Sequence, residues 1–152
     1  QDQQEDGPGQ APVRPLRNPS AGLIIQAGNV KEEILMAVFT EKAKQVVTNP
    51  GTGTIEKEIL VDPALFQGTN DLFARITLHP GCAVPVHQHL GNNETYYLLK
   101  GEGEYTDEDK KVAVKAGDVT FCADGGTHGL MNTGKEDLVF IALISNTPGY
   151  KR

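Results

Sequence analysis

Three histidines and one glutamate carry the clearest chemical signal in this sequence. His87 and His89 stand two residues apart, Glu94 follows them, and His128 lies near the end of the chain. Side chains two apart on a strand point to the same face, so both imidazoles of the pair can project into one cavity. Imidazole nitrogens and a carboxylate oxygen together suit a divalent transition metal. These four residues are therefore candidate metal ligands, although each taken singly also fits a solvated surface residue or a core residue.

Short strands joined by turns must position these side chains. The sequence has 17 glycines, 9 prolines and no tryptophan in 152 residues, and it shows no alternation of strands with helices. Residues 83–89 predict a strand that carries the histidine pair, and a turn at 90–93 leads to Glu94 at the start of the neighbouring strand. Similar patterns predict strands at 55–61, 72–78, 94–100, 111–114, 119–123, 128–132 and 138–144. Roughly eight or nine antiparallel strands in a sandwich or barrel are therefore expected.

Two stretches before the histidine pair are less clear. The segment 36–47 fits either a strand or a short helix, because its apolar residues follow neither period. The segment 62–70 predicts a loop with one helical turn.

The first 35 residues differ in composition from the rest of the chain. They are rich in Gln, Pro, Gly and charged residues, with little to bury, which is typical of a disordered segment. A Lys-Glu-Glu triplet at 31–33 also fits translated upstream sequence ahead of a natural start at Met36. We therefore divide the chain into a flexible leader or tail at 1–35 and a single domain at 36–152.

Composition and charge argue against several functional classes. A net charge of −6 without a basic stripe disfavours nucleic acid and anionic membranes as partners. No apolar run approaches the roughly 20 residues of a transmembrane helix, and no signal segment is recognisable, so a cytoplasmic location is expected. Cys82 and Cys122 lie far apart in the sequence, which favours free thiols over a disulfide.

The spacing of glycines around the proposed ligands resembles the two motifs of the cupin superfamily. The first motif, G-x5-H-x-H-x4-E-x6-G, is matched by Gly81, His87, His89, Glu94 and Gly101. The second, G-x5-P-x-G-x2-H-x3-N, is matched by Gly117, Gly125, His128 and Asn132, with Ala123 at the proline position. Because that proline shapes a turn, its replacement affects the loop and not the ligands.

This resemblance implies an all-β fold, a double-stranded β-helix or jelly-roll barrel, similar to small single-domain cupins. It also implies that His87, His89, Glu94 and His128 bind the metal inside the barrel. Four ligands leave two positions of a six-coordinate ion open, which favours iron(II) or manganese over a closed structural zinc site. Nickel, zinc, cobalt and copper also accept this mixed donor set.

An open metal site of this kind predicts Lewis-acid chemistry on a small oxygenated substrate, either a sugar or a carboxylic acid. Isomerase or lyase chemistry, or dioxygenase chemistry with iron(II), would fit. Tyr96 shares a strand face with Glu94 and is the candidate catalytic group, as an acid/base or a substrate-orienting residue; packing in the barrel is the alternative. A non-catalytic barrel that binds a small ligand or a metal is the second hypothesis. A homodimer is expected, because second subunits often cover the exposed edges of small barrels.

Overall fold

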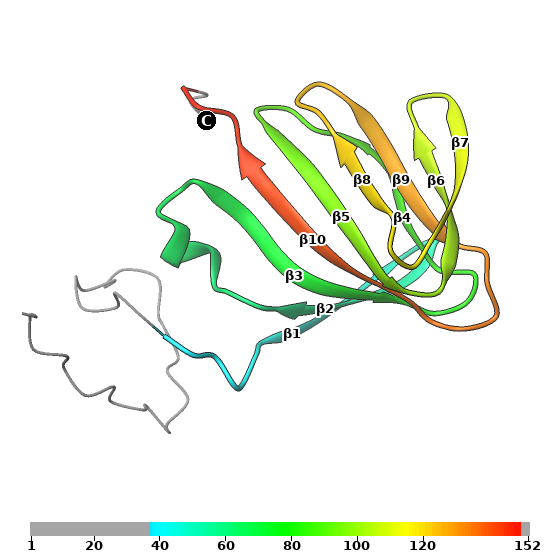
Figure 1. The fold of residues 1–152 in the computed structure, drawn as a ribbon, viewed down its shortest axis with the longest axis horizontal. Coiled ribbons are helices and arrows are strands. Elements are labelled where there is room, and N and C mark those ends of the chain that lie inside the picture. Colours follow the sequence, from blue (N-terminus) through cyan, green and yellow to red (C-terminus); the bar gives the residue numbers. More distant parts are fainter. Residues whose placement is uncertain (1–36, 150–152) are drawn as a thin grey trace, which may run out of the picture.

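Two antiparallel sheets face each other in the computed structural model, which describes residues 37–149 (Figure 1). The larger sheet has the order β1 (Lys44–Asn49), β2 (Gly53–Ile59), β3 (Asn70–Leu78), β10 (Leu138–Asn146), β5 (Asn92–Lys100) and β8 (Val119–Cys122). The smaller sheet has the order β4 (Ala83–Gln88), β9 (Thr127–Asn132), β6 (Glu102–Asp107) and β7 (Lys110–Lys115). The all-β jelly-roll prediction is confirmed.

Eight of the described strands begin and end within two residues of the predicted ranges, whereas β6 was not among the predicted strands. Only the end of the ambiguous stretch 36–47, from Lys44 on, forms a strand, β1. The helical turn predicted within 62–70 is a 3-10 helix, η1 (Pro63–Phe66). The predicted leader at 1–35 lies outside the described residues. Cys82 and Cys122 are both free thiols, as expected. No helix among residues 37–149 is long and apolar enough to cross a bilayer.

The core lies between the two sheets and is built from the inward residues of alternating strands. On β3, Ala74, Ile76 and Leu78 are at most 3% exposed, whereas Arg75 between them faces solvent. Phe140 of β10 stands opposite Leu98 of β5, and neither is exposed. This period of two is the pattern of strands with one buried face.

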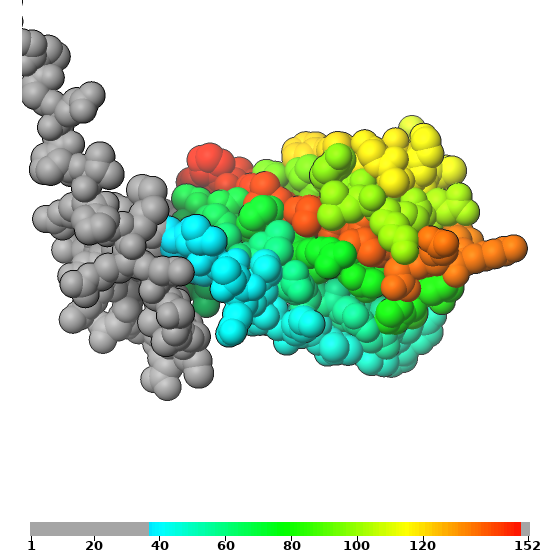
Figure 2. All heavy atoms as spheres, turned by 60° about the horizontal axis from the view of Figure 1, so that its bottom comes forward, coloured from blue at the N-terminus to red at the C-terminus, as the bar shows by residue number. Residues whose placement is uncertain are grey.

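The outer face of the larger sheet points away from this core. It shows β10 as an orange band between the green shades of β3 and β5 (Figure 2).

Gly101, between β5 and β6, is required by the backbone at the point where the chain passes from one sheet to the other. Its φ is +86°, and a Cβ atom there would lie 2.6 Å from the carbonyl oxygen of Asp137. Only glycine adopts this conformation readily and leaves room for the second backbone. The tight crossing places the start of β6 in the smaller sheet, directly after β5 of the larger one.

The placement of Glu94 differs from the sequence-based expectation. β4 pairs only with β9 among the described strands, whereas β5 lies in the opposite sheet between β10 and β8. The expectation that Glu94 begins the strand next to the histidine pair was therefore wrong. The residues at 89–91 carry the chain from one sheet to the other, so Glu94 meets the histidines across the interior of the barrel.

Candidate metal centre

The four predicted ligands come from three strands and one loop end. His87 on β4 and His128 on β9 are directly opposite each other in the antiparallel register. His89 lies just beyond the end of β4, where its N–H donates to the Gly126 carbonyl (2.9 Å) and its carbonyl accepts from the Gly125 N–H (2.8 Å). These two backbone bonds extend the strand pairing by one residue and fix the second imidazole of the pair.

Four donor atoms, one from each residue, converge on a single point. The three Nε2 atoms are 3.2 Å (His87–His89), 3.2 Å (His87–His128) and 3.0 Å (His89–His128) apart. Oε2 of Glu94 lies 3.1 Å from His89, 3.0 Å from His128 and 3.6 Å from His87. Two donors bound to one ion at about 2.1 Å stand roughly 3.0 to 3.4 Å apart, for angles between a right angle and tetrahedral. Five of the six observed separations fall in this range, and the 3.6 Å between His87 and Glu94 corresponds to a slightly wider angle, so the four atoms fit a common ion.

The hydrogen bonds behind the imidazoles favour this arrangement. Nδ1 of His87 donates to the Pro85 carbonyl at 2.8 Å, and Nδ1 of His89 donates to Oδ1 of Asn92 at 2.7 Å. An oxygen acceptor at Nδ1 assigns the proton of a neutral ring to that nitrogen, so Nε2 keeps its lone pair. Both lone pairs then face the central point, where they and a carboxylate repel one another unless a cation lies between them.

Two tyrosines complete the surroundings of the cluster. The Tyr96 hydroxyl donates to Oε2 of Glu94 at 3.0 Å, and the Tyr105 hydroxyl lies 2.9 Å from Nδ1 of His128. The Tyr96 ring also stacks on the imidazole of His128, with centroids 5.1 Å apart and planes at 25°. Each tyrosine thus fixes the orientation of one member of the cluster.

The electrostatics of the cluster favour positive charge at its centre. Burial by itself would raise the pKa of Glu94, but the nearby imidazoles of His128 and His87 and the hydrogen bond from Tyr96 outweigh burial and hold that pKa below its usual range. The Glu94 carboxylate, 3.6 Å from Nε2 of His87, raises the pKa of His87, against partial burial and the charge of Lys57. A site that keeps its carboxylate ionised and favours the protonated form of His87 is also suited to a metal cation.

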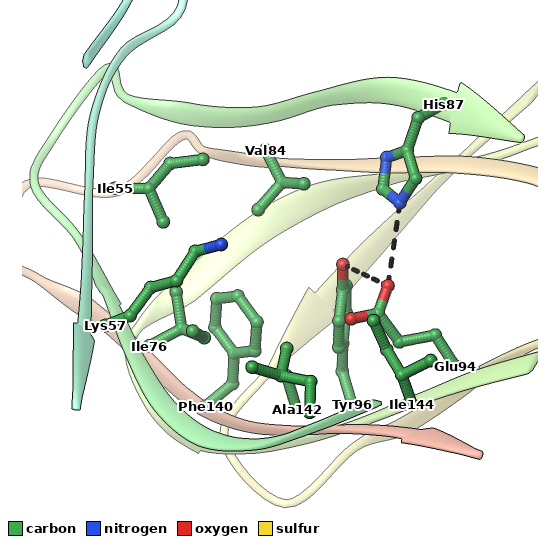
Figure 3. Close-up of a pocket in the computed structure, with 11 residues that line it drawn as sticks. Ile55, Lys57, Ile76, Val84, His87, Glu94, Tyr96, Phe140, Ala142 and Ile144 are labelled. Carbon is green, nitrogen blue, oxygen red and sulfur yellow. Dashed lines mark hydrogen bonds and ion pairs between the residues drawn. The ribbon is translucent and has the colours of Figure 1, made fainter. Parts of the chain in front are cut away.

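A cavity of about 170 Å³ adjoins the cluster between the two sheets (Figure 3). The side chain of His87 is 39% exposed, whereas those of His89, Glu94 and His128 are at most 5% exposed. Glu94 and Tyr96 line the same cavity, and the remaining lining is apolar except for one charged side chain. The lining consists of Ile55, Lys57, Leu72, Ile76, Val84, His87, Glu94, Tyr96, Phe140, Ala142 and Ile144.

The structure brings together all four residues that the sequence predicted as ligands, and they could hold a metal ion. It places Tyr96 beside Glu94, which leaves its predicted catalytic role as a prediction. Asn132 has a purely structural environment: its side-chain amide donates to the carbonyls of Leu78 and Glu136, both at 2.8 Å.

Sequence reasoning missed three residues of the site, namely Asn92, Tyr105 and Lys57. Asn92 stood in an expected turn, and Tyr105 belongs to neither glycine-histidine motif. For Lys57 a signal was present, because strict alternation in Ile55 to Ile59 places this lysine on the same face as the two isoleucines.

Comparison with known proteins agrees with this architecture. A family model described as a cupin domain matches residues 74–144, which include all four cluster residues. An oxalate-binding protein of Thermotoga maritima is 44% identical over 94 residues, which are 62% of this chain and 78% of that protein. An uncharacterized protein of Methanocaldococcus jannaschii is 30% identical over 98 residues, 64% of this chain and 76% of that protein.

A solved structure supports the same conclusion. The crystal structure of a "predicted oxalate decarboxylase" from Thermotoga maritima matches with a TM-score of 0.69 and 39% identity, and it covers 74% of this chain and 100% of that one. Fold, motif residues and sequence similarity therefore agree that the chain belongs to the cupin family.

Proposed function

We propose that this protein binds a small carboxylate compound, of the size and charge of oxalate, through a divalent metal ion held by His87, His89, Glu94 and His128. The observation that carries the proposal is the convergence of four donor atoms beside a cavity that His87 faces. Oxalate has two oxygens that can occupy adjacent open positions on one ion. The similarity to an oxalate-binding protein supports this ligand class.

The size of the cavity supports a ligand of few atoms. Its volume of about 170 Å³ is below the roughly 300 to 1,000 Å³ of pockets that accept drug-sized ligands. Since a short carboxylic acid fills less space than a sugar derivative, the cavity favours the carboxylic acid of the two substrate classes that the sequence left open.

For the metal we propose manganese or iron(II), with nickel and zinc as the alternatives. Four protein donors leave two positions of a six-coordinate ion for the ligand, whereas a structural zinc site is closed by its four donors. Neither free cysteine belongs to the cluster. When bound, the ion would act as a Lewis acid on the ligand oxygens.

A metal-dependent enzyme of the isomerase, lyase or dioxygenase type is the second candidate. The similarity to a structure described as a "predicted oxalate decarboxylase" favours lyase chemistry within this class. Among the residues described, Glu94 is the only carboxylate that lines the cavity, and it belongs to the cluster. Burial, together with the charge of Glu94, raises the pKa of Tyr96 well above its ordinary value, so its phenol stays protonated at neutral pH. We therefore propose that Tyr96 positions Glu94, and that binding is the primary activity.

The test measures metal content and oxalate affinity together. We expect the wild-type protein, incubated with manganese and dialysed, to keep about one ion per chain and to bind oxalate only when loaded. The double variant His87→Ala/His128→Ala should keep no ion. His79→Ala is the matched control, because this histidine lies outside the cluster. Full metal content in the double variant, or oxalate binding by the metal-free wild type, would contradict the proposal.

For the chain as a whole, we propose one barrel domain over 36–152, in the cytoplasm and as a homodimer. The described strands from β1 to β10 form a single pair of sheets, which supports one domain. Exposed apolar side chains on the outer face of β5 and β8 support the dimer, which is tested below.

A further inference from the structure

We infer that Lys57 selects for anionic ligands, by pairing with a carboxylate of the compound bound in the cavity. This inference rests on the proposed function and goes beyond it, because it assigns a specificity role to a residue outside the metal cluster. Figure 3 shows the Lys57 amine reaching into the cavity between Val84 and Phe140, on the side opposite the pair His87 and Glu94, with Tyr96 between the amine and Glu94 in that view.

The position of Lys57 in the sheet directs its side chain inward. On β2, Ile55 is buried and Ile59 packs against the core, and Lys57 stands between them in the alternation. Its partner on β3 is Ile76, which is 3% exposed and lines the same cavity. An inward lysine on an otherwise apolar strand face loses hydration at its charged end and needs a compensating group.

The carboxylates nearest to Lys57 in sequence lie on the other face of the sheet. Glu56 accepts from His79 at 2.8 Å, and Glu58 stands opposite Arg75 on β3. Inside the cavity, Glu94 faces three imidazoles and the Tyr96 hydroxyl. Within residues 37–149, the side-chain ammonium of Lys57 has no hydrogen bond or ion pair. A ligand carboxylate would supply the missing partner.

The charges of the site favour a dianion. A divalent ion brings two positive charges, Glu94 removes one and Lys57 adds one, which leaves two positive charges for the ligand to balance. Charge-assisted hydrogen bonds between an ammonium and a carboxylate are roughly twice as strong as neutral ones. The ligand class is therefore a small dicarboxylate, with oxygens at the metal and a carboxylate within reach of Lys57.

The experiment compares two ligands that differ by one charge. Oxalate and oxamate have the same shape, but oxamate carries an amide in place of one carboxylate. Dissociation constants are measured by calorimetry on manganese-loaded protein, with metal content checked in every sample. We expect Lys57→Met to weaken oxalate binding about tenfold and oxamate binding much less, at unchanged metal content.

Two further variants serve as controls. Lys57→Arg keeps the charge and should retain the preference for oxalate. Lys44→Met removes an exposed charge from the neighbouring strand β1 and should leave both affinities unchanged. Equal affinity of Lys57→Met and wild type for oxalate, or an equal loss for both ligands, would overturn the inference alone. Failure of the loaded wild type to bind either ligand would overturn the proposed function and this inference with it.

Discussion

The Tyr105 hydroxyl lies 2.9 Å from Nδ1 of His128, behind the ring whose Nε2 faces the rest of the cluster. The two residues are on adjacent strands, because Asp107 of β6 stands opposite His128 of β9 and Tyr105 is two residues further along the same face. Tyr105 is 5% exposed and His128 1%. The imidazole is thus held between a phenol on one side and the proposed metal position on the other.

Replacement of Tyr105 by phenylalanine should weaken metal binding. Partners of metal-binding histidines orient the ring, and their loss lowers metal affinity by about tenfold to a hundredfold. Competition with a chromophoric chelator measures the affinity. Tyr97→Phe is the matched control, since Tyr97 is 47% exposed. An unchanged metal affinity in Tyr105→Phe would show that the hydroxyl has no role in orienting His128.

Replacement of Tyr96 by phenylalanine separates its two possible roles. If Tyr96 positions Glu94, loss of the 3.0 Å hydrogen bond should lower metal affinity by about tenfold, and any activity should recover at saturating metal. The remaining ring still packs on Phe140, with centroids 4.6 Å apart, so the fold should persist. Lost turnover at full metal content would instead favour the direct catalytic role predicted from the sequence.

His79 should make stability depend on pH. Hydrogen bonds to Asp137 and Glu56, both at 2.8 Å, raise the pKa of its imidazole from 6.5 to about 9. Because the folded-state pKa is the higher one, the contribution is complete below pH 6.5 and disappears as the pH rises through about 9. The side chain is 46% exposed, so the contribution should stay below about 1 kcal/mol.

Urea unfolding of the wild type and His79→Gln across this pH range tests the dependence. The difference in unfolding free energy between the two proteins should be larger at pH 6 than at pH 10. A difference that stays constant with pH would contradict the proposed ion pairs. Comparison with a variant removes the contributions of the cluster histidines, which are common to both proteins.

Alanine at position 101 should destabilise the fold by more than alanine at position 51. Both glycines have positive φ, +86° and +80°, so both variants introduce backbone strain, typically about 1 to 2 kcal/mol. Only at Gly101 would the new Cβ also meet the Asp137 carbonyl, at 2.6 Å. Denaturant unfolding should therefore show a loss of about 2 to 4 kcal/mol for Gly101→Ala. Equal losses would show that the close approach is readily relieved.

The predicted homodimer should involve the outer face of β5 and β8. Tyr97 and Val119 are opposite each other in the register, and Leu99 and Phe121 lie nearby on the same face. These four apolar side chains are 44–63% exposed, an arrangement typical of interaction surfaces. Phe121→Glu should yield a monomer in sedimentation experiments. A monomeric wild type at all concentrations, or a dimeric Phe121→Glu, would contradict this.

The fold class and the cluster residues were predictable because both depend on local patterns. Strand alternation and turn residues indicated an all-β chain, and the spacing of His87, His89, Glu94 and His128 within the glycine pattern identified the cluster. The sheet to which each strand belongs was not predictable in the same way. The turn signal at 90–93 indicates that the chain reverses direction, but it does not indicate that the chain changes sheets. For this reason the sequence-based prediction placed Glu94 wrongly beside β4.

The sequence by itself therefore determined which side chains could bind a metal, since their chemical types and spacing are local properties. The tertiary structure alone decided which residues of distant segments surround them: Tyr105 behind His128, and Lys57 in the wall of the cavity beside the cluster. These contacts depend on strand register and on the distance between two sheets, which are set by packing of the whole core. No local pattern encodes the separation of residues that lie dozens of positions apart in the chain.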